Sequence, residues 1–172
     1  MAKMIETLAP LAGNYRVLLC DVWGVLHNGM RAFPDAVAAL RAARAAGQAV
    51  VLVTNSPRPQ GGVADQLAML DVPEDCYDRI VSSGDVTRRL IADGPRRVFH
   101  LGPDRDLMIY DGLDVELAEE FEAQAVVCTG MFDDDETPDD YAGMLQRFRA
   151  RNLPFICANP DIVVERGDEL IW

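Results

Sequence analysis

Basic residues are scarce in this sequence, and lysine is almost absent. The 172 residues include 16 Lys and Arg against 28 Asp and Glu, which gives a formal net charge of −12. The single lysine is Lys3. Nucleic acids and anionic membrane surfaces are bound through a basic face that neutralises phosphate charge. We therefore expect no nucleic-acid or membrane partner, whereas a small phosphorylated molecule held beside a bound cation stays compatible with the composition.

Long apolar runs and paired cysteines are also missing. The longest apolar stretches, such as Val50–Val53, are far shorter than the roughly 20 residues that span a bilayer. The amino end does not resemble a secretory signal, because polar residues interrupt it. No CxxC pair or metal-ligand spacing occurs among the four cysteines, which are Cys20, Cys76, Cys128 and Cys157. Three of them, Cys20, Cys128 and Cys157, lie in or after apolar strand-like runs, so we expect buried free thiols and a cytoplasmic location.

What the sequence does contain is an alternation of short β-branched runs with helical patterns, which is typical of a parallel α/β sheet. Strands are predicted at Arg16–Cys20, Ala49–Val53, Arg79–Ser82, Arg97–Leu101, Ala125–Thr129 and Pro154–Ala158. Helices are predicted at Pro34–Ala46, Gly62–Leu70, Asp85–Ala92, Glu116–Glu122 and from the N-cap residue Thr137 to Arg151. The final residues, Glu165–Trp172, show no helix or cap, which favours a truncated domain.

A carboxylate follows the first predicted strand directly. Asp21 comes after the apolar run Arg16–Cys20, and ligands of open parallel sheets bind at the carboxyl ends of the strands. An aspartate there can attack phosphorus and form an aspartyl-phosphate. Gly24 allows the backbone to turn sharply beside a ligand. Taken alone, Asp21 would more often cap a turn.

A hydroxyl and an amide follow the second predicted strand, in the segment Val53–Pro57. Because consecutive strands of such sheets are often neighbours, Asp21 and Thr54 are expected to flank one crevice. Thr54 Oγ1 and the Asn55 backbone N–H would then donate to phosphoryl oxygens. The alternative for this segment alone is a Ser/Thr turn before a loop. The two strand ends together favour a phosphate site.

These segments resemble the haloacid dehalogenase superfamily. DVWGVLHNG (Asp21–Gly29) and VTNSPRP (Val53–Pro59) are similar to its first two motifs, in the same order. The helix between them resembles class IIA hydrolases, which include 4-nitrophenyl-phosphate and pyridoxal-phosphate phosphatases. Asn159-Pro160-Asp161 is similar to a segment of the cap domain in that class. The resemblance covers essentially the whole chain.

The resemblance implies an α/β fold with a Rossmann-like core and an inserted α/β cap. Residues 1–83 would form the N-terminal part of the core, with a flap over Gly24–Phe33. Residues 84–172 would belong to the cap, which covers the site and selects the substrate. A small phosphorylated metabolite is the implied substrate, and a homodimer through the cap is the implied assembly.

The resemblance also implies the roles of single residues. Asp21 would be the nucleophile and a Mg²⁺ ligand, and Trp23 would give its backbone carbonyl to the same ion. Thr54 and Asn55 would bind the phosphoryl group, with Gly24 beside them. Mg²⁺ suits an all-oxygen site that also touches substrate phosphate. The implied reaction is Mg²⁺-dependent hydrolysis of a phosphomonoester through an aspartyl-phosphate on Asp21.

The sequence departs from the family pattern in two places. Phosphatases of the family carry an acid/base Asp two residues after the nucleophile, worth about 10²–10⁴-fold in rate, and Trp23 stands there instead. His27, Asp35 and cap carboxylates are candidate substitutes. The family also uses a lysine and an acidic loop from the second half of the core, and neither follows Asn159. The active site within these residues is therefore expected to be incomplete.

Two other functions stay open. Trp23 and the missing lysine are compatible with a non-catalytic module that binds phosphate without turnover. A hydrolase acting at carbon, as dehalogenases do, would use Asp21 as nucleophile without Mg²⁺. Dependence of the activity on Mg²⁺ would distinguish a phosphatase from the hydrolase acting at carbon. Phosphate release that depends on Asp21 would exclude the non-catalytic module.

Overall fold

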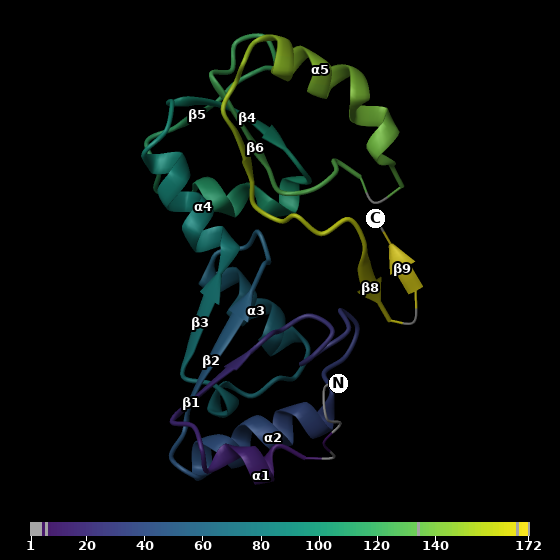
Figure 1. Cartoon of the computed structure of the whole chain (residues 1–172). Coiled ribbons are helices and arrows are strands. Elements are labelled where there is room, and N and C mark those ends of the chain that lie inside the picture. The colour runs from purple at the N-terminus through teal and green to yellow at the C-terminus, as the bar shows by residue number, and fades with distance from the viewer. Residues whose placement is uncertain (1–4, 6, 134, 168, 172) are drawn as a thin grey trace. The chain divides into compact units, whose positions relative to one another are not determined.

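The structure is a computed structural model that describes residues 5, 7–133, 135–167 and 169–171. The chain forms two compact units, and their elements are labelled in Figure 1. Of the described residues, the first unit takes those within 5–54, 64–81 and 165–169, and the second takes those within 55–63, 82–164 and 170–171. The predicted domain boundary at residue 83 stays a prediction.

The first unit is built on a three-stranded sheet ordered β1-β2-β3. Its strands are β1 (Val17–Cys20), β2 (Ala49–Thr54) and β3 (Arg79–Ser82). The helical elements are α1 (Ala9–Ala12), α2 (Pro34–Ala45) and the 3-10 helix η1 (Glu74–Cys76), together with the later part of α3 (Gln60–Met69), whose first residues belong to the second unit. β1 and β2 run parallel, with Cys20 opposite Leu52, so their carboxyl ends lie at the same edge.

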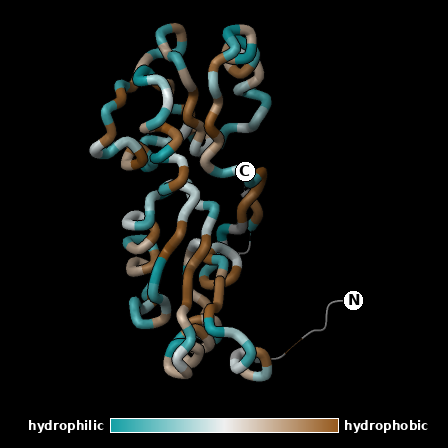
Figure 2. The backbone as a smooth tube through the Cα atoms, turned by 60° about the vertical axis from the view of Figure 1, so that its left-hand side comes forward, coloured by the Kyte–Doolittle hydropathy of each residue, from teal (hydrophilic) through white to brown (hydrophobic). Residues whose placement is uncertain are grey.

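One face of this sheet is covered and the other is open among the described residues. Side chains of a strand alternate between the two faces, and on β2 Val50, Leu52 and Thr54 are buried. On the other face Leu19 is 68% exposed, and Val53 is exposed as well. Figure 2 shows that these strands are largely hydrophobic. The first unit therefore presents an apolar sheet face to solvent.

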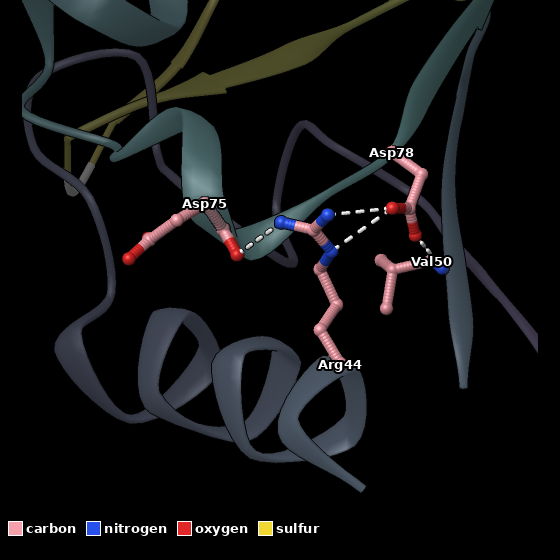
Figure 3. Close-up of polar contacts among 4 residues, drawn as sticks. All are labelled: Arg44, Val50, Asp75 and Asp78. Atoms are coloured by element: carbon pink, nitrogen blue, oxygen red, sulfur yellow. Dashed lines mark hydrogen bonds and ion pairs between the residues drawn. The ribbon is translucent and has the colours of Figure 1, made fainter. Parts of the chain in front are cut away.

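The amino end of β2 and the residue before β3 are held to α2 by a polar clamp, shown in Figure 3. The Arg44 guanidinium donates to Asp78 Oδ1 from Nη2 at 2.6 Å and to the Asp75 carbonyl from Nη1 at 2.5 Å. The other oxygen of Asp78 accepts from the Val50 backbone N–H at 2.7 Å. A single carboxylate thus joins the last turn of α2 to the start of β2.

The second unit contains a four-stranded parallel sheet ordered β5-β4-β6-β7. The strands are β4 (Arg97–Leu101), β5 (Glu116–Leu117), β6 (Ala125–Cys128) and β7 (Phe155–Cys157). The helices are α4 (Ser83–Ala92), η2 (Asp104–Tyr110), η3 (Pro138–Tyr141) and α5 (Ala142–Ala150). After β7 the chain forms a short hairpin of β8 (Val164–Arg166) and β9 (Glu169–Ile171), whose residues are divided between the two units.

Both faces of the second sheet are covered. Val127 packs in one cluster with Ile91 of α4 and Ile109 of η2. Its neighbour Val126 packs in another cluster with Phe148 of α5. Neighbouring residues of a strand point to opposite faces of the sheet, so α4 and α5 cover opposite faces. The second unit is therefore a three-layer α/β/α structure.

The predicted α/β fold with parallel strands is confirmed. The helix predicted at Glu116–Glu122 is wrong, because this segment begins with β5. Glu116 N donates to Arg96 O at 2.8 Å and Ala118 N to Val98 O at 2.9 Å, so strand pairing overrides the helix propensity of its Glu, Leu and Ala residues. The hairpin β8–β9 was not predicted. No helix in the described part of the chain is long and apolar enough to cross a membrane.

The four cysteines are free, as predicted. Full burial was predicted for the three cysteines of apolar runs and is wrong for them, because Cys20 and Cys128 are half-buried and Cys157 is exposed. Cys76, which lies outside such a run, is buried. Burial raises the pKa of the Cys128 thiol to about 11. This thiol is therefore protonated at neutral pH.

Candidate active site

Asp21 and Thr54 lie at the same edge of the first sheet. Cys20 of β1 is opposite Leu52 of β2, so Asp21 lies one residue beyond that pair and Thr54 two residues beyond it. The carboxyl ends of parallel strands are where ligands of open α/β sheets bind. The sequence prediction that one crevice edge carries both side chains is consistent with this register.

The two side chains differ in exposure. Asp21 is exposed, and its Oδ1 accepts from the Val22 backbone N–H at 2.7 Å. Thr54 is buried, with 7% of its surface exposed. Val22 and Leu52, which lie within two positions of these residues in the chain, are buried and hold the two strand ends in place. A solvent-facing carboxylate at the end of a strand can attack a bound phosphoryl group.

The segment after Asp21 folds into a compact flap that surrounds Trp23. Gly29 has a φ of 80°, and a Cβ added there would lie 2.6 Å from the Trp23 ring. Gly24 also has a positive φ of 77°, which a side chain would strain. The Trp23 ring meets the ring of His27 edge-on, with centroids 5.0 Å apart. Trp23, at the position of the family's acid/base, is thus a packing residue of the flap.

His27 does not have the environment of a proton donor. It is buried, with 1% of its surface exposed. Its Nδ1 accepts from the Gly29 backbone N–H at 3.0 Å, and burial lowers the pKa of its imidazole. A neutral ring with one nitrogen already accepting a hydrogen bond stabilises the flap. Asp35, the other proposed substitute within the first unit, is an exposed residue in the first turn of α2.

Asn55, which follows Thr54, belongs to the second unit. Its side-chain Nδ2 donates to Asp161 Oδ2 at 2.7 Å and to Asn159 Oδ1 at 3.4 Å. The sequence singled out Asn55 and the Asn159-Pro160-Asp161 segment separately. No signal in it indicated that they contact each other, because 104 and 106 residues separate Asn55 from its two partners.

The loop after Asn55 is held by α4. Gly84 N donates to Ser56 O at 3.0 Å, and a Cβ added at Gly84 would lie 2.3 Å from the backbone of Arg58. The carboxylate of Asp85 accepts from Gln60 N, at the start of α3. These contacts fix the course of residues 55–60 within the second unit, and the sequence prediction missed them.

The donor set at Asp21 fits a magnesium ion only in part. Among the residues that the structure describes, no three His, Cys, Asp or Glu side chains gather to hold a metal. Mg²⁺ is commonly bound through one or two carboxylates, with waters and substrate phosphate completing its shell. The exposed Asp21 carboxylate and the Trp23 carbonyl fit such a partial set. Further ligands would have to come from phosphate and water.

A surface hollow lies elsewhere, around the polar clamp at the amino end of β2. It is lined by Arg41, Arg44, Gln48, Asp75 and Asp78, among others. Both of its arginines are bound by carboxylates, Arg41 by Asp75 and Arg44 by Asp78. This hollow is therefore a structural junction, at the sheet edge opposite Asp21 and Thr54.

Known proteins share this architecture. A family model described as haloacid dehalogenase-like hydrolase matches residues 18–116. A search of curated proteins finds no match. Among solved structures, a hydrolase of the haloacid dehalogenase-like family from Brucella suis 1330 is 64% identical, with a TM-score of 0.96. The match covers 98% of this chain and 63% of the Brucella chain.

More distant structures share the fold. A possible sugar phosphatase from Cytophaga hutchinsonii matches with 22% identity and a TM-score of 0.79, over 98% of this chain and 63% of its own. A glycerol phosphate phosphatase from Mycobacterium tuberculosis, in complex with magnesium, matches with 24% identity and a TM-score of 0.66, over 92% of this chain and 48% of its own. The chain thus spans less than two thirds of the length of these structures. It belongs to the haloacid dehalogenase-like hydrolase family.

Proposed function

We propose that the protein containing this chain is a class IIA phosphatase that hydrolyses a small phosphomonoester with Mg²⁺, using Asp21 as its nucleophile. The observation that carries the proposal is the placement of Asp21 and Thr54 at the carboxyl ends of two neighbouring parallel strands. The names of two relatives, a sugar phosphatase and a glycerol phosphate phosphatase, support a small phosphorylated metabolite as substrate.

In the proposed reaction an oxygen of the Asp21 carboxylate attacks phosphorus. The bond from phosphorus to the ester oxygen breaks, and the leaving alcohol takes up a proton. Water then attacks the aspartyl-phosphate, which releases inorganic phosphate and restores the carboxylate. Thr54 Oγ1 and the Asn55 backbone N–H donate to the phosphoryl oxygens and stabilise the negative charge that develops on them.

A bound Mg²⁺ would neutralise charge on the phosphoryl group. Asp21 and the backbone carbonyl of Trp23 are the residues of this chain that would hold it. The magnesium bound in the Mycobacterium tuberculosis relative supports this cofactor. The lysine of the family pattern, and any further acidic ligands, would have to be supplied by residues outside this chain.

The second candidate is a phosphate-binding module without turnover. It is favoured by the packing of Trp23 against Gly29 and His27, because a tryptophan at the acid/base position cannot transfer a proton. Loss of a positioned acid/base typically costs about 10²–10⁴-fold in rate. The two candidates agree on phosphate binding and differ only in turnover.

Phosphate release from 4-nitrophenyl phosphate by the longest reading frame that contains this chain separates the candidates. We expect Mg²⁺-dependent release that EDTA abolishes and that Asp21→Asn removes. Asp65→Asn is the matched control, since Asp65 is an exposed aspartate of the same unit and should keep activity. Turnover that survives Asp21→Asn would refute the nucleophile. Phosphate binding without release would favour the non-catalytic module.

A further inference from the structure

We propose that Asp161, together with Asn159, is a positioning residue for Asn55. The inference rests on the proposed function, in which the Asn55 backbone N–H donates to the phosphoryl group. It gives a role to the Asn159-Pro160-Asp161 segment, which the reaction outlined above does not use. The contacts that carry it all lie within the second unit.

The turn formed by these three residues presents two acceptors to one amide. Asn55 Nδ2 donates to Asp161 Oδ2 at 2.7 Å, and Asn159 Oδ1 lies 3.4 Å from the same nitrogen. Asn159 Oδ1 also accepts from Asp161 N at 3.1 Å, which closes the turn. A carboxylate is a stronger acceptor than a neutral amide oxygen. Asp161 is therefore the main anchor and Asn159 shapes the turn that presents it.

The turn itself starts from a fixed point of the second sheet. It follows β7, which pairs with β6. Ala158, the residue before Asn159, is buried at 2% exposure, and its N–H donates to Cys128 O at 2.8 Å. Because the strand pairing fixes Ala158, the Asp161 carboxylate has little freedom to follow Asn55. Asn55 is thus the group that is held.

Anchoring the Asn55 side chain restricts its main chain. The carboxamide is only two bonds from Cα, so a fixed amide limits the rotation of the neighbouring peptide groups. One residue further on, Ser56 O accepts from Gly84 N at 3.0 Å. Two anchors on consecutive residues fix the direction of the Asn55 N–H before ligand binds, and preorganised donors stabilise charge without reorganisation.

The competing explanation is that the contact only stabilises the loop and the turn, without any effect on phosphate binding. Variants of Asp161 distinguish this explanation from a positioning role. Asp161→Ala removes the acceptor, whereas Asp161→Asn keeps an oxygen that can accept from Asn55. Asp139→Ala is the control, since Asp139 is another exposed aspartate of the second unit. Thr54→Val, which removes the proposed phosphate donor, tests the proposed function in the same assay.

The experiment uses the ¹⁵N-labelled protein from the longest reading frame that contains this chain, with inorganic phosphate and Mg²⁺ as the probe. Amide exchange at Asn55 reports the anchoring, and chemical-shift titration reports phosphate affinity. We expect Asp161→Ala to speed exchange at Asn55 and to weaken phosphate binding about three- to tenfold. Asp161→Asn should stay within about twofold of the unsubstituted chain, and Asp139→Ala should change neither readout.

The outcomes separate failure of the inference from failure of the proposed function. If Thr54→Val weakens phosphate binding but Asp161→Ala does not, the inference is overturned and the proposed function stands. The same holds if Asp161→Ala speeds exchange without loss of affinity, since the contact then only stabilises the loop and the turn. If Thr54→Val leaves phosphate binding unchanged, or the whole protein binds no phosphate, the proposed function fails and the inference falls with it.

Discussion

His27 is expected to make the stability of the flap around Trp23 depend on pH. It is buried against the Trp23 ring, and its Nδ1 accepts from Gly29 N. Burial lowers the pKa of the folded-state imidazole below its ordinary value of 6.5. On acidification the unfolded chain therefore takes up a proton at this site before the folded chain does. Folding stability is lost as the pH falls through 6.5 toward the lower, folded-state value.

His27→Asn removes this dependence while keeping an acceptor for Gly29. We predict that the unsubstituted chain loses more free energy of unfolding than the variant between neutral pH and about pH 5. Urea denaturation of both proteins across this range measures the difference. Parallel curves would show that His27 does not titrate differently on folding. The other histidine, His100, is present in both chains and cancels in the comparison.

The residue scale also shows how far the sequence could predict the site. Asp21 and Thr54 were identifiable because each follows an apolar run at a strand's carboxyl end, a local pattern. The contact of Asn55 with Asp161 joins residues 106 positions apart. The close approach of Gly84 to Arg58 depends on how a loop meets a helix start. Neither leaves a local trace in the sequence.

Among the elements, the clamp on α2 gives the sharpest prediction. The Val50 N–H bond first, and then Arg44, hold the pKa of the Asp78 carboxyl below its ordinary value of 3.8. A carboxylate with a lowered pKa stabilises the fold above its unfolded-state value, and that stability is lost as the pH falls through the folded-state pKa. The stability that Asp78 gives by joining α2 to β2 is thus expected to fall at acidic pH.

We predict that Asp78→Asn lowers the melting temperature at neutral pH and that the difference shrinks below pH 3.8. Thermal denaturation followed by circular dichroism measures both values. Asp65→Asn, at an exposed aspartate of α3, is a control that should change the melting temperature little at either pH. A difference that is constant with pH would contradict the role of the charged carboxylate.

The elements were predicted unevenly, for physical reasons. The strands with apolar, β-branched runs were placed correctly because a buried parallel strand needs such residues. The segment Glu116–Glu122 consists of helix formers and a phenylalanine, yet its first residues pair with β4. The hairpin β8–β9 spans residues 164–171, a segment in which no periodic pattern predicts a strand or helix. Strand pairing decides such short segments, because β5 pairs with β4 and β8 pairs with β9.

At the scale of the whole molecule, the open apolar face of the first sheet is a surface through which the chain can associate. Parallel sheets are normally covered on both faces, and Leu19 is 68% exposed on this one. The chain also matches only 63% of the length of its Brucella relative. Apolar patches of this kind promote association. We expect the 172-residue chain to self-associate as its concentration rises.

Leu19→Lys should reduce this association, because a charge on the face opposes burial. Sedimentation velocity over a range of concentrations measures it. Met69→Lys is the matched control, since Met69 is 74% exposed but lies on α3. Equal effects of the two substitutions would show that net charge, rather than the sheet face, governs association.

The central claim is that Asp21 is a phosphoryl-accepting nucleophile, and trapping its intermediate tests this most directly. The longest reading frame containing the chain is mixed with 4-nitrophenyl phosphate and Mg²⁺, quenched in acid and analysed by peptide mass spectrometry. We predict a mass increase of one phosphoryl group on the peptide that carries Asp21, absent in Asp21→Asn. Phosphate release with no modification of that peptide, or with modification at another residue, would contradict the account.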